Sequence, residues 1–222
     1  MKTNVLISTC KKIPLDWKWD EKINSKFISV NSDLKTVVFF EGFESKGTAG
    51  IKGNTPIESG SYYYEIKVKE NLFGTAVMFG FGTEDITLNY NDYNYCNLIG
   101  LDSEGWGLSH KGTVWHDGKS RQFCDAFFEA DTLIGILLHD KKIHYFINGQ
   151  YKGIAFDNVK TNKKLYPVVS STAADIELEL VNSFRLEYSL KDLCLHKVQN
   201  LFKNEIDCLQ IPKSLILCLK QM

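Results

Sequence analysis

The sequence has almost no net charge: its 26 basic and 27 acidic side chains leave a formal charge of −1 over 222 residues. The two signs are mixed along the chain, so it has no basic stripe of the kind that binds a nucleic acid backbone. Long apolar runs are also absent. Residues 133–138 form one of the longest, far short of the ~20 residues that a membrane-spanning helix needs. The sequence therefore predicts neither a nucleic acid nor a membrane partner.

Paired cysteine motifs are missing as well. Six cysteines stand at positions 10, 96, 124, 194, 208 and 218, and no two of them form a C-x-x-C pair. This spacing favours free thiols in a reducing compartment over a disulfide framework or a zinc site. The first twelve residues hold an apolar run only at 5–7, too short for a signal peptide. We therefore expect a protein of the cytoplasm or the nucleus.

The motifs of common enzymes are absent too. No glycine-rich phosphate loop occurs, residues 170–172 lack the glycine-flanked elbow of a serine hydrolase, and the five histidines are scattered. Asp175, Glu177 and Glu179 alternate along a predicted strand, as the carboxylates of a sandwich-fold glycosidase would. A solvent-facing outer strand is the favoured interpretation, because a general acid needs a desolvated carboxyl group. We expect no catalytic residues, no metal and no cofactor.

Short strands dominate from about Phe27 to Val181. Residues 62–68 alternate between apolar and polar positions, and Asn148-Gly149 separates two strand-like runs in the manner of a tight hairpin. Regular strands with turn residues between them indicate an antiparallel sandwich of roughly a dozen strands. We assign the sandwich to residues 27–182, and residues 1–26 to an N-terminal arm that packs on it through Trp17 and Trp19.

One predicted loop has the composition of a binding surface. Residues 88–97 contain three tyrosines and four asparagines. Tyrosine offers rigid contact area, and asparagine offers adaptable hydrogen bonding. The alternative is a polar loop whose tyrosines fold back onto the sandwich.

A different pattern begins at Ser189. Ser189 and Asp192 have the spacing of a capping box at a helix start. An apolar face then follows at helical spacing, formed by Leu190, Leu193, Cys194, Val198, Leu201 and Phe202. A segment of this length cannot bury such a face against itself. It needs a partner, either the body of this protein or another protein.

Six short motifs recur along the predicted sandwich: WKWD at 17–20, GSYYYEI at 60–66, FGFG at 79–82, GWGL at 105–108, FING at 146–149 and LYPVVS at 165–170. Together they resemble the SPRY domain over about residues 17–182. Residues 189–222 are similar to a SOCS box, so the chain as a whole resembles the SPRY domain-containing SOCS box family. This resemblance implies an all-β fold: a SPRY (concanavalin-like) antiparallel β-sandwich with a small C-terminal α-helical SOCS box.

The SOCS-box resemblance implies the partner that the apolar face requires. In the family a leucine and, four residues later, a cysteine enter a pocket on elongin C; Leu190 and Cys194 match them, and Val198 continues the face. A small thiol suits a tight apolar pocket. Leu209, Ile211 and Pro212 match the cullin-5 segment, although Gln210 stands where the family usually has proline.

The resemblance implies a non-catalytic substrate-recognition subunit of a ubiquitin ligase, with elongin B, elongin C, cullin-5 and its RING protein as partners. Sister members bind short asparagine-containing peptides, so the expected target carries a short linear degron. Their pocket tyrosine corresponds to Tyr95, with Asn97 and Leu98 beside it. Thr172, Ala173 and Ala174 replace a Val-Trp-Gly element, and a third pocket segment falls near residues 41–45. The alternative is a SPRY interaction scaffold that recruits no ligase and whose tail docks on its own sandwich.

Overall fold

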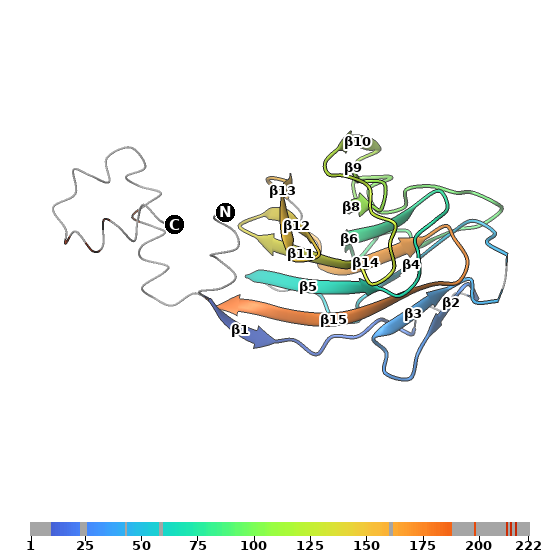
Figure 1. Ribbon diagram of the computed structural model, residues 1–222, viewed down its shortest axis with the longest axis horizontal. Helices are drawn as coiled ribbons and strands as arrows, with labels where there is room; N and C mark the ends of the chain where they lie inside the picture. Colours follow the sequence, from blue (N-terminus) through green and yellow to red (C-terminus); the bar gives the residue numbers. More distant parts are fainter. Residues whose placement is uncertain are drawn as a thin grey trace.

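The computed structural model describes residues 10–22, 26–42, 44–57, 60–159 and 162–187, and the single residues 198, 212, 214 and 216. Within these ranges the chain forms fifteen strands in two antiparallel sheets (Figure 1). The predicted all-β sandwich is therefore confirmed.

The first sheet has the order β13-β12-β11-β5-β15-β3-β2, and β1 pairs with the far part of β15. Figure 1 shows β5 and β15 side by side along the length of the domain. The strands of this sheet are β1 (Lys11–Pro14), β2 (Ile28–Val30), β3 (Thr36–Phe39), β5 (Ser61–Val68), β11 (Leu133–His139), β12 (Lys142–Ile147), β13 (Gln150–Phe156) and β15 (Ile176–Glu187).

The second sheet has the order β10-β9-β8-β6-β14-β4-β7. Its strands are β4 (Thr48–Lys52), β6 (Val77–Thr83), β7 (Asn89–Tyr90), β8 (Gly105–Ser109), β9 (Thr113–His116), β10 (Lys119–Gln122) and β14 (Leu165–Ser171). Its centre is tightly packed: a Cβ atom added to Gly80 of β6 would lie 2.0 Å from the carbonyl oxygen of Trp106 in β8. Only glycine allows the two strands to approach so closely.

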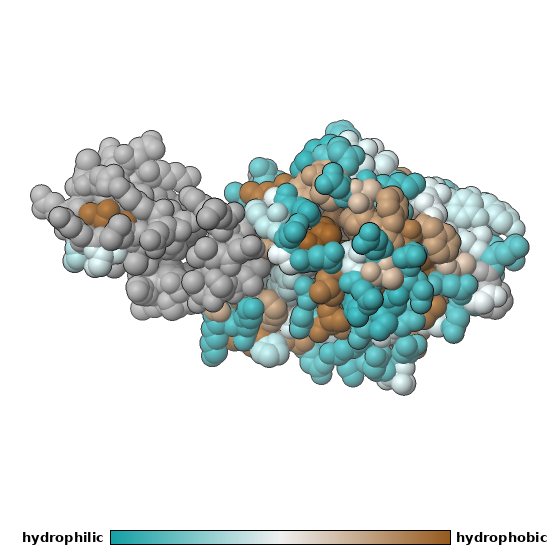
Figure 2. Space-filling model, viewed as in Figure 1, coloured by the Kyte–Doolittle hydropathy of each residue, from teal (hydrophilic) through white to brown (hydrophobic). Residues whose placement is uncertain are grey.

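The core lies between the two sheets and follows the strand alternation. In β5, Tyr64, Ile66 and Val68 are buried while the residues between them are half-buried. The buried Tyr145 of β12 donates a hydrogen bond of 2.9 Å from its hydroxyl to the carbonyl of Phe79 in the opposite sheet. Polar and apolar residues are interspersed on the face of the domain shown in Figure 2.

The predicted hairpin at Asn148-Gly149 is confirmed. Both residues have positive φ, 50° and 73°, and they join β12 to β13 with Ile147 opposite Gln150. The two main-chain conformations are those that a primed two-residue turn requires.

The N-terminal segment is more closely integrated than the predicted arm. Trp17 and Trp19 are buried in the core with their ring centroids 5.1 Å apart, and the Trp19 indole donates to the carbonyl of Lys35 at 2.8 Å. Residues 11–14 add a strand, β1, to the first sheet. At the other end of the domain sequence, β15 continues to Glu187. The boundary expected at residue 182 thus falls inside a strand.

The predicted SOCS box lies almost entirely outside the described residues. Val198, Ser214 and Ile216 are helical, and the amide of Ile216 donates to the carbonyl of Pro212 at 3.2 Å. Leu190, Cys194, Leu209 and Ile211 belong to the part that the structure does not describe. No helix in the described ranges is long and apolar enough to cross a membrane.

Candidate functional site

Three loops meet at one end of the sandwich, and Ser45 joins them. Ser45 lies in the loop between β3 and β4. Its hydroxyl donates to the carbonyl of Thr172, before β15, at 2.6 Å. Its own carbonyl accepts a hydrogen bond of 2.7 Å from the hydroxyl of Tyr95, in the loop after β7. The three segments that the family resemblance assigns to a peptide pocket therefore form one surface, which we call the loop end.

Contacts with the loop backbone fix the position of the tyrosine-rich loop. Thr48 donates from its hydroxyl to the carbonyl of Asn94 at 2.8 Å and accepts from the amide of Cys96 at 3.0 Å. Gly47 has a φ of 146°, and a Cβ atom there would lie 2.1 Å from the carbonyl oxygen of Tyr90. Because no larger residue fits this close approach, Gly47 determines how the tyrosine-rich loop lies on β4.

The tyrosines of that loop differ in position: one folds back onto the sandwich, and two are exposed as in a binding loop. Tyr90 is half-buried and packs against the apolar cluster that contains Leu98 and Ile99. Tyr93 and Tyr95 are 63% and 39% exposed. The Tyr95 hydroxyl is held by Ser45 while much of its ring faces solvent, as a preorganised contact residue would be.

The structure places the other predicted peptide contacts differently. Leu98 is 2% exposed and packs in the core with Met78 and Val168, so its side chain is unavailable to a ligand. Thr172 is also buried: its hydroxyl accepts from the amide of Ala76 at 2.8 Å and donates to the carbonyl of that residue at 3.0 Å. These two predicted contacts are structural instead, because their side chains are already enclosed by the protein.

The remaining predicted residues lie nearer the surface or support it. Asn97 and Ala174 are half-buried. Ala173 is buried, and its amide and carbonyl both bond the hydroxyl of Ser171. With alanine where the family carries a bulky tryptophan, this part of the surface has a smaller apolar element than the resemblance implies. Of the predicted contact residues, Tyr95 has the most exposed side chain.

A hollow of about 520 Å³ borders the loop end. Phe73, which is 54% exposed, lines it. Phe73 is not predicted from the sequence, because one aromatic residue in a polar loop carries no periodic signal. The remaining lining residues are Val38, Glu41, Glu70, Asn71, Asp175 and Glu177.

The carboxylates of β15 have the surroundings of a solvated sheet surface. Ile176 and Leu178 are fully buried, while Glu177 and Glu179 on the opposite side are half-buried. Glu179 pairs with Lys69 at 3.1 Å, and this hydrogen bond raises the pKa of the lysine. A carboxylate in such a pair is unsuited to proton donation. β15 lies between β5 and β3 and is therefore not the edge or outer strand that the sequence suggested. Its carboxylates nevertheless lie on the solvent-facing side of the sheet, which favours a structural role over a glycosidase.

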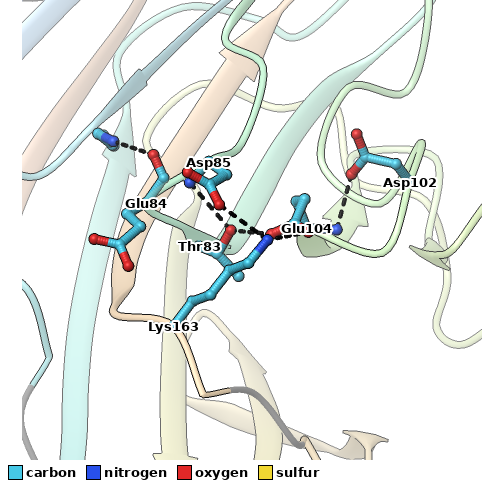
Figure 3. Close-up of polar contacts among 7 residues, drawn as sticks. Thr83, Glu84, Asp85, Asp102, Glu104 and Lys163 are labelled. Carbon is cyan, nitrogen blue, oxygen red and sulfur yellow. Dashed lines mark hydrogen bonds and ion pairs between the residues drawn. The ribbon is translucent and has the colours of Figure 1, made fainter.

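A cluster of polar side chains away from the loop end is structural. Lys163 contacts Asp85 at 2.9 Å and Glu104 at 2.7 Å (Figure 3). The hydrogen bond from Lys163 holds the pKa of Glu104 below its usual range, and Thr83 donates a further hydrogen bond to the same carboxylate. The pairs tie the segment before β14 to the end of β6. With its carboxylate already paired, Glu104 is not poised as a general acid.

No group of three or more metal-ligating side chains occurs among the residues that the structure describes. Cys96 and Cys124 form no disulfide there, and burial raises the pKa of both thiols. Neither cysteine is therefore activated as a nucleophile.

The two-sheet architecture and the loop end define the class of this protein. The SPRY domain family model matches residues 61–181, and the chain belongs to that family. Among solved structures, the SPRY domain of human HERC1 has a TM-score of 0.59 at 17% identity, covering 74% of this chain and 97% of that one. The TRIM65 PSpry domain has a TM-score of 0.60 at 15% identity, covering 81% and 95%. Both show the same fold.

The curated relatives belong to a narrower group than the SPRY domain family as a whole. The chain is 33% identical over 198 residues to SPRY domain-containing SOCS box protein 3 of Xenopus tropicalis, covering 88% of this chain and 54% of the relative. It is 29% identical over 215 residues to human SPRY domain-containing SOCS box protein 1, covering 89% and 77%. The chain thus spans about half the length of the Xenopus relative. These similarities support the resemblance seen in the sequence motifs.

Proposed function

We propose that this protein is a substrate-recognition subunit of a ubiquitin ligase. The loop end of the SPRY domain binds a short, asparagine-containing segment of a target protein. Residues 189–222 act as a SOCS box that recruits elongins B and C, cullin-5 and a RING protein. The target is then ubiquitinated and degraded by the proteasome. In this proposal the protein itself performs no covalent chemistry and works in the cytoplasm or the nucleus.

The observation that carries the proposal is the contact of Ser45 with both Tyr95 and Thr172. It brings together three loops that are distant in sequence, and it leaves the ring of one tyrosine presented to solvent. Rigid scaffolds commonly display binding residues on such loops. The names of these relatives contain both SPRY and SOCS box, and this supports the second half of the proposal.

Ligase recruitment is tested by co-expression with elongins B and C, followed by size-exclusion chromatography. We expect the full chain to elute as a ternary complex, and the double variant Leu190→Ala/Cys194→Phe to elute alone. The matched control is Cys124→Ala, a cysteine of the sandwich that should leave the complex intact. A wild-type chain that elutes without elongins would overturn the ligase assignment and favour the scaffold.

Target recognition is tested separately, with fluorescent asparagine-containing peptides and polarisation as the measurement. Tyr95→Ala should weaken binding at least tenfold, because a central tyrosine anchor contributes on the order of 2 kcal/mol. Tyr166→Ala, at the start of β14 and therefore at the other end of the sandwich, is the control. Equal losses in both variants would show that the peptide binds elsewhere.

The proposed binding of cullin-5 can be tested at Gln210. Restoring the proline that the family usually has, with Gln210→Pro, should strengthen cullin-5 capture by the purified elongin complex without changing elongin binding. Unchanged cullin-5 capture, or preferential capture of cullin-2 by the wild type, would contradict the cullin-5 assignment.

A further inference from the structure

The loop end extends beyond the three loops that Ser45 joins. The loop between β5 and β6 approaches the predicted peptide contacts so closely that a Cβ atom added to its Gly74 would lie 3.0 Å from the Cβ of Ala173. The loop before β11 lies beside that loop, because the amide of Leu72 donates to the carbonyl of Phe128 at 2.7 Å. Two further loops therefore border the surface to which we assign the target peptide.

Exposed aromatic side chains gather at this end of the sandwich. Among the described residues six large apolar side chains are exposed, and four of them stand on these loops: Phe73, Phe128, Tyr93 and Tyr95. Single exposed apolar residues are ordinary, but a group of them at one end of a domain indicates an interaction surface. Phe73 is 54% exposed and lines the hollow of about 520 Å³. Its ring is therefore open to a side chain that enters the hollow.

The hollow beside Phe73 is acidic. Four carboxylates line it: Glu41, Glu70, Asp175 and Glu177. The described lining residues include no lysine or arginine, and none of the four carboxylates forms an ion pair with a described residue. Lys69 lies near Glu177, but its ammonium group is already paired with Glu179 at 3.1 Å. Within the described part of the chain, the hollow thus has no free counter charge.

The backbone holds these like charges together. The Oδ1 atom of Asp175 accepts a hydrogen bond of 2.8 Å from the amide of Gly42, which keeps the neighbouring Glu41 close to the start of β15. Glu177 lies on β15 opposite Val38 of β3, and both residues line the hollow. A concave surface with charges of one sign raises the local concentration of the opposite charge. We therefore expect the hollow to attract cations.

A basic side chain of the target satisfies both features of the hollow. The aliphatic stem of a lysine or arginine packs on an apolar surface while its charged group reaches a polar one. A cation close to the face of an aromatic ring is itself attracted to the ring. An apolar target side chain would leave the carboxylates without a counter charge, and an acidic one would be repelled.

We propose that the target carries a lysine or arginine close to its asparagine-containing segment, and that this basic side chain enters the hollow. Its stem packs on Phe73, and its charge lies among Glu41, Glu70 and Glu177. This inference rests on the proposed function, because the same target segment occupies the surface around Tyr95.

Fluorescence polarisation with matched peptides tests the proposal on the full chain. The fluorescein-labelled peptides contain a central asparagine between glycine and serine residues, and one variable residue placed before or after it. The variable residue is lysine, norleucine, which has a similar stem without the charge, or glutamate. In one of the two placements the lysine peptide should bind about fivefold more tightly than the norleucine peptide, and the glutamate peptide should bind most weakly. The advantage of lysine should shrink at high salt.

Carboxylate variants then locate the effect. Glu41→Gln/Glu177→Gln should remove the advantage of the lysine peptide and leave the affinity for the norleucine peptide unchanged. The matched control is Glu84→Gln/Asp157→Asn, which removes the same charge from exposed positions at the other end of the sandwich. Phe73→Ala should weaken the binding of both the lysine and the norleucine peptide.

The outcomes distinguish this inference from the proposed function. Equal binding of all three peptides, or tightest binding of the norleucine or glutamate peptide, would overturn the basic residue; peptide recognition would stand if Tyr95→Ala still weakened each peptide. An advantage of lysine that persists in Glu41→Gln/Glu177→Gln, or that the control variant loses equally, would place the contact elsewhere and also overturn the inference. Binding of no peptide at all would overturn both the inference and the proposed recognition.

Discussion

The coupling of the loops through Ser45 makes a quantitative prediction. Ser45→Ala removes the hydroxyl that donates to the carbonyl of Thr172, and Tyr95→Phe removes the donor to the carbonyl of Ser45. Each loss should lower the free energy of unfolding by about 1 kcal/mol, the usual net value of one hydrogen bond. The Tyr95 value should be the smaller one, because that side chain is partly exposed and water replaces its lost partner.

The two effects should not add. Once Ser45 no longer holds Thr172, its loop relaxes and its carbonyl becomes a poorer acceptor for Tyr95. We expect the double variant to be less destabilised than the sum by about 0.5 kcal/mol, a typical coupling for residues in one network.

Urea denaturation followed by tryptophan fluorescence measures the free energy of unfolding of the wild type, the two single variants and the double variant. Tyr93→Phe is the control within the same loop, because its hydroxyl has no hydrogen bond among the described residues and its side chain is 63% exposed. It should change stability by less than about 0.5 kcal/mol and add to Ser45→Ala without coupling. Strict additivity of Ser45→Ala and Tyr95→Phe would refute the linkage of the three loops.

Three further predictions concern the sandwich. Gly47→Ala should destabilise the domain by about 2 kcal/mol or more, measured by urea denaturation, because its Cβ would meet the Tyr90 carbonyl. Gly149→Ala is the control: its Cβ would have no atom within 4 Å, and it should cost about 1 kcal/mol. Burial lowers the pKa of His110 to about 4 in the folded protein. The unfolded chain, with a histidine pKa near 6.5, binds more protons between these two values, so the free energy of unfolding should fall as the pH drops from about 6.5 to 4. His110→Phe should reduce this dependence in pH-dependent melts. Lys163→Met removes two surface ion pairs and should lower the melting temperature only slightly, with a smaller difference at high salt. A large loss that does not depend on salt would contradict a solvent-screened surface cluster.

The architecture was largely predictable because it follows from local patterns. Each of these patterns spans only a few residues: the alternation in β5, the turn at Asn148-Gly149, and the paired tryptophans at 17 and 19. The structure confirms all three. The number of strands was underestimated, since β1, β7 and β10 are short edge strands with few buried side chains. Their place depends on pairing with distant segments, which one sequence does not reveal.

The candidate site was predictable only in part. The composition of residues 88–97 indicated a binding loop, and the resemblance placed Tyr95 at its centre. The enclosure of Leu98 depends on Val168 of β14, and that of Thr172 on hydrogen bonds with the backbone of Ala76, just before β6. The role of Ser45 depends on two hydrogen bonds across 50 and 127 residues of sequence. Contacts of this range carry no local signal.

Strand β15 sets a fixed distance within the molecule. Its twelve residues, at about 3.4 Å each, extend about 40 Å from the loop end to the point where the chain enters residues 188–222. In the proposed ligase this strand separates the captured peptide from Glu187, after which the proposed recruiting segment follows in the sequence. Inserting residues after Glu187 should therefore change which lysines of a target receive ubiquitin, while the affinity for its peptide stays the same.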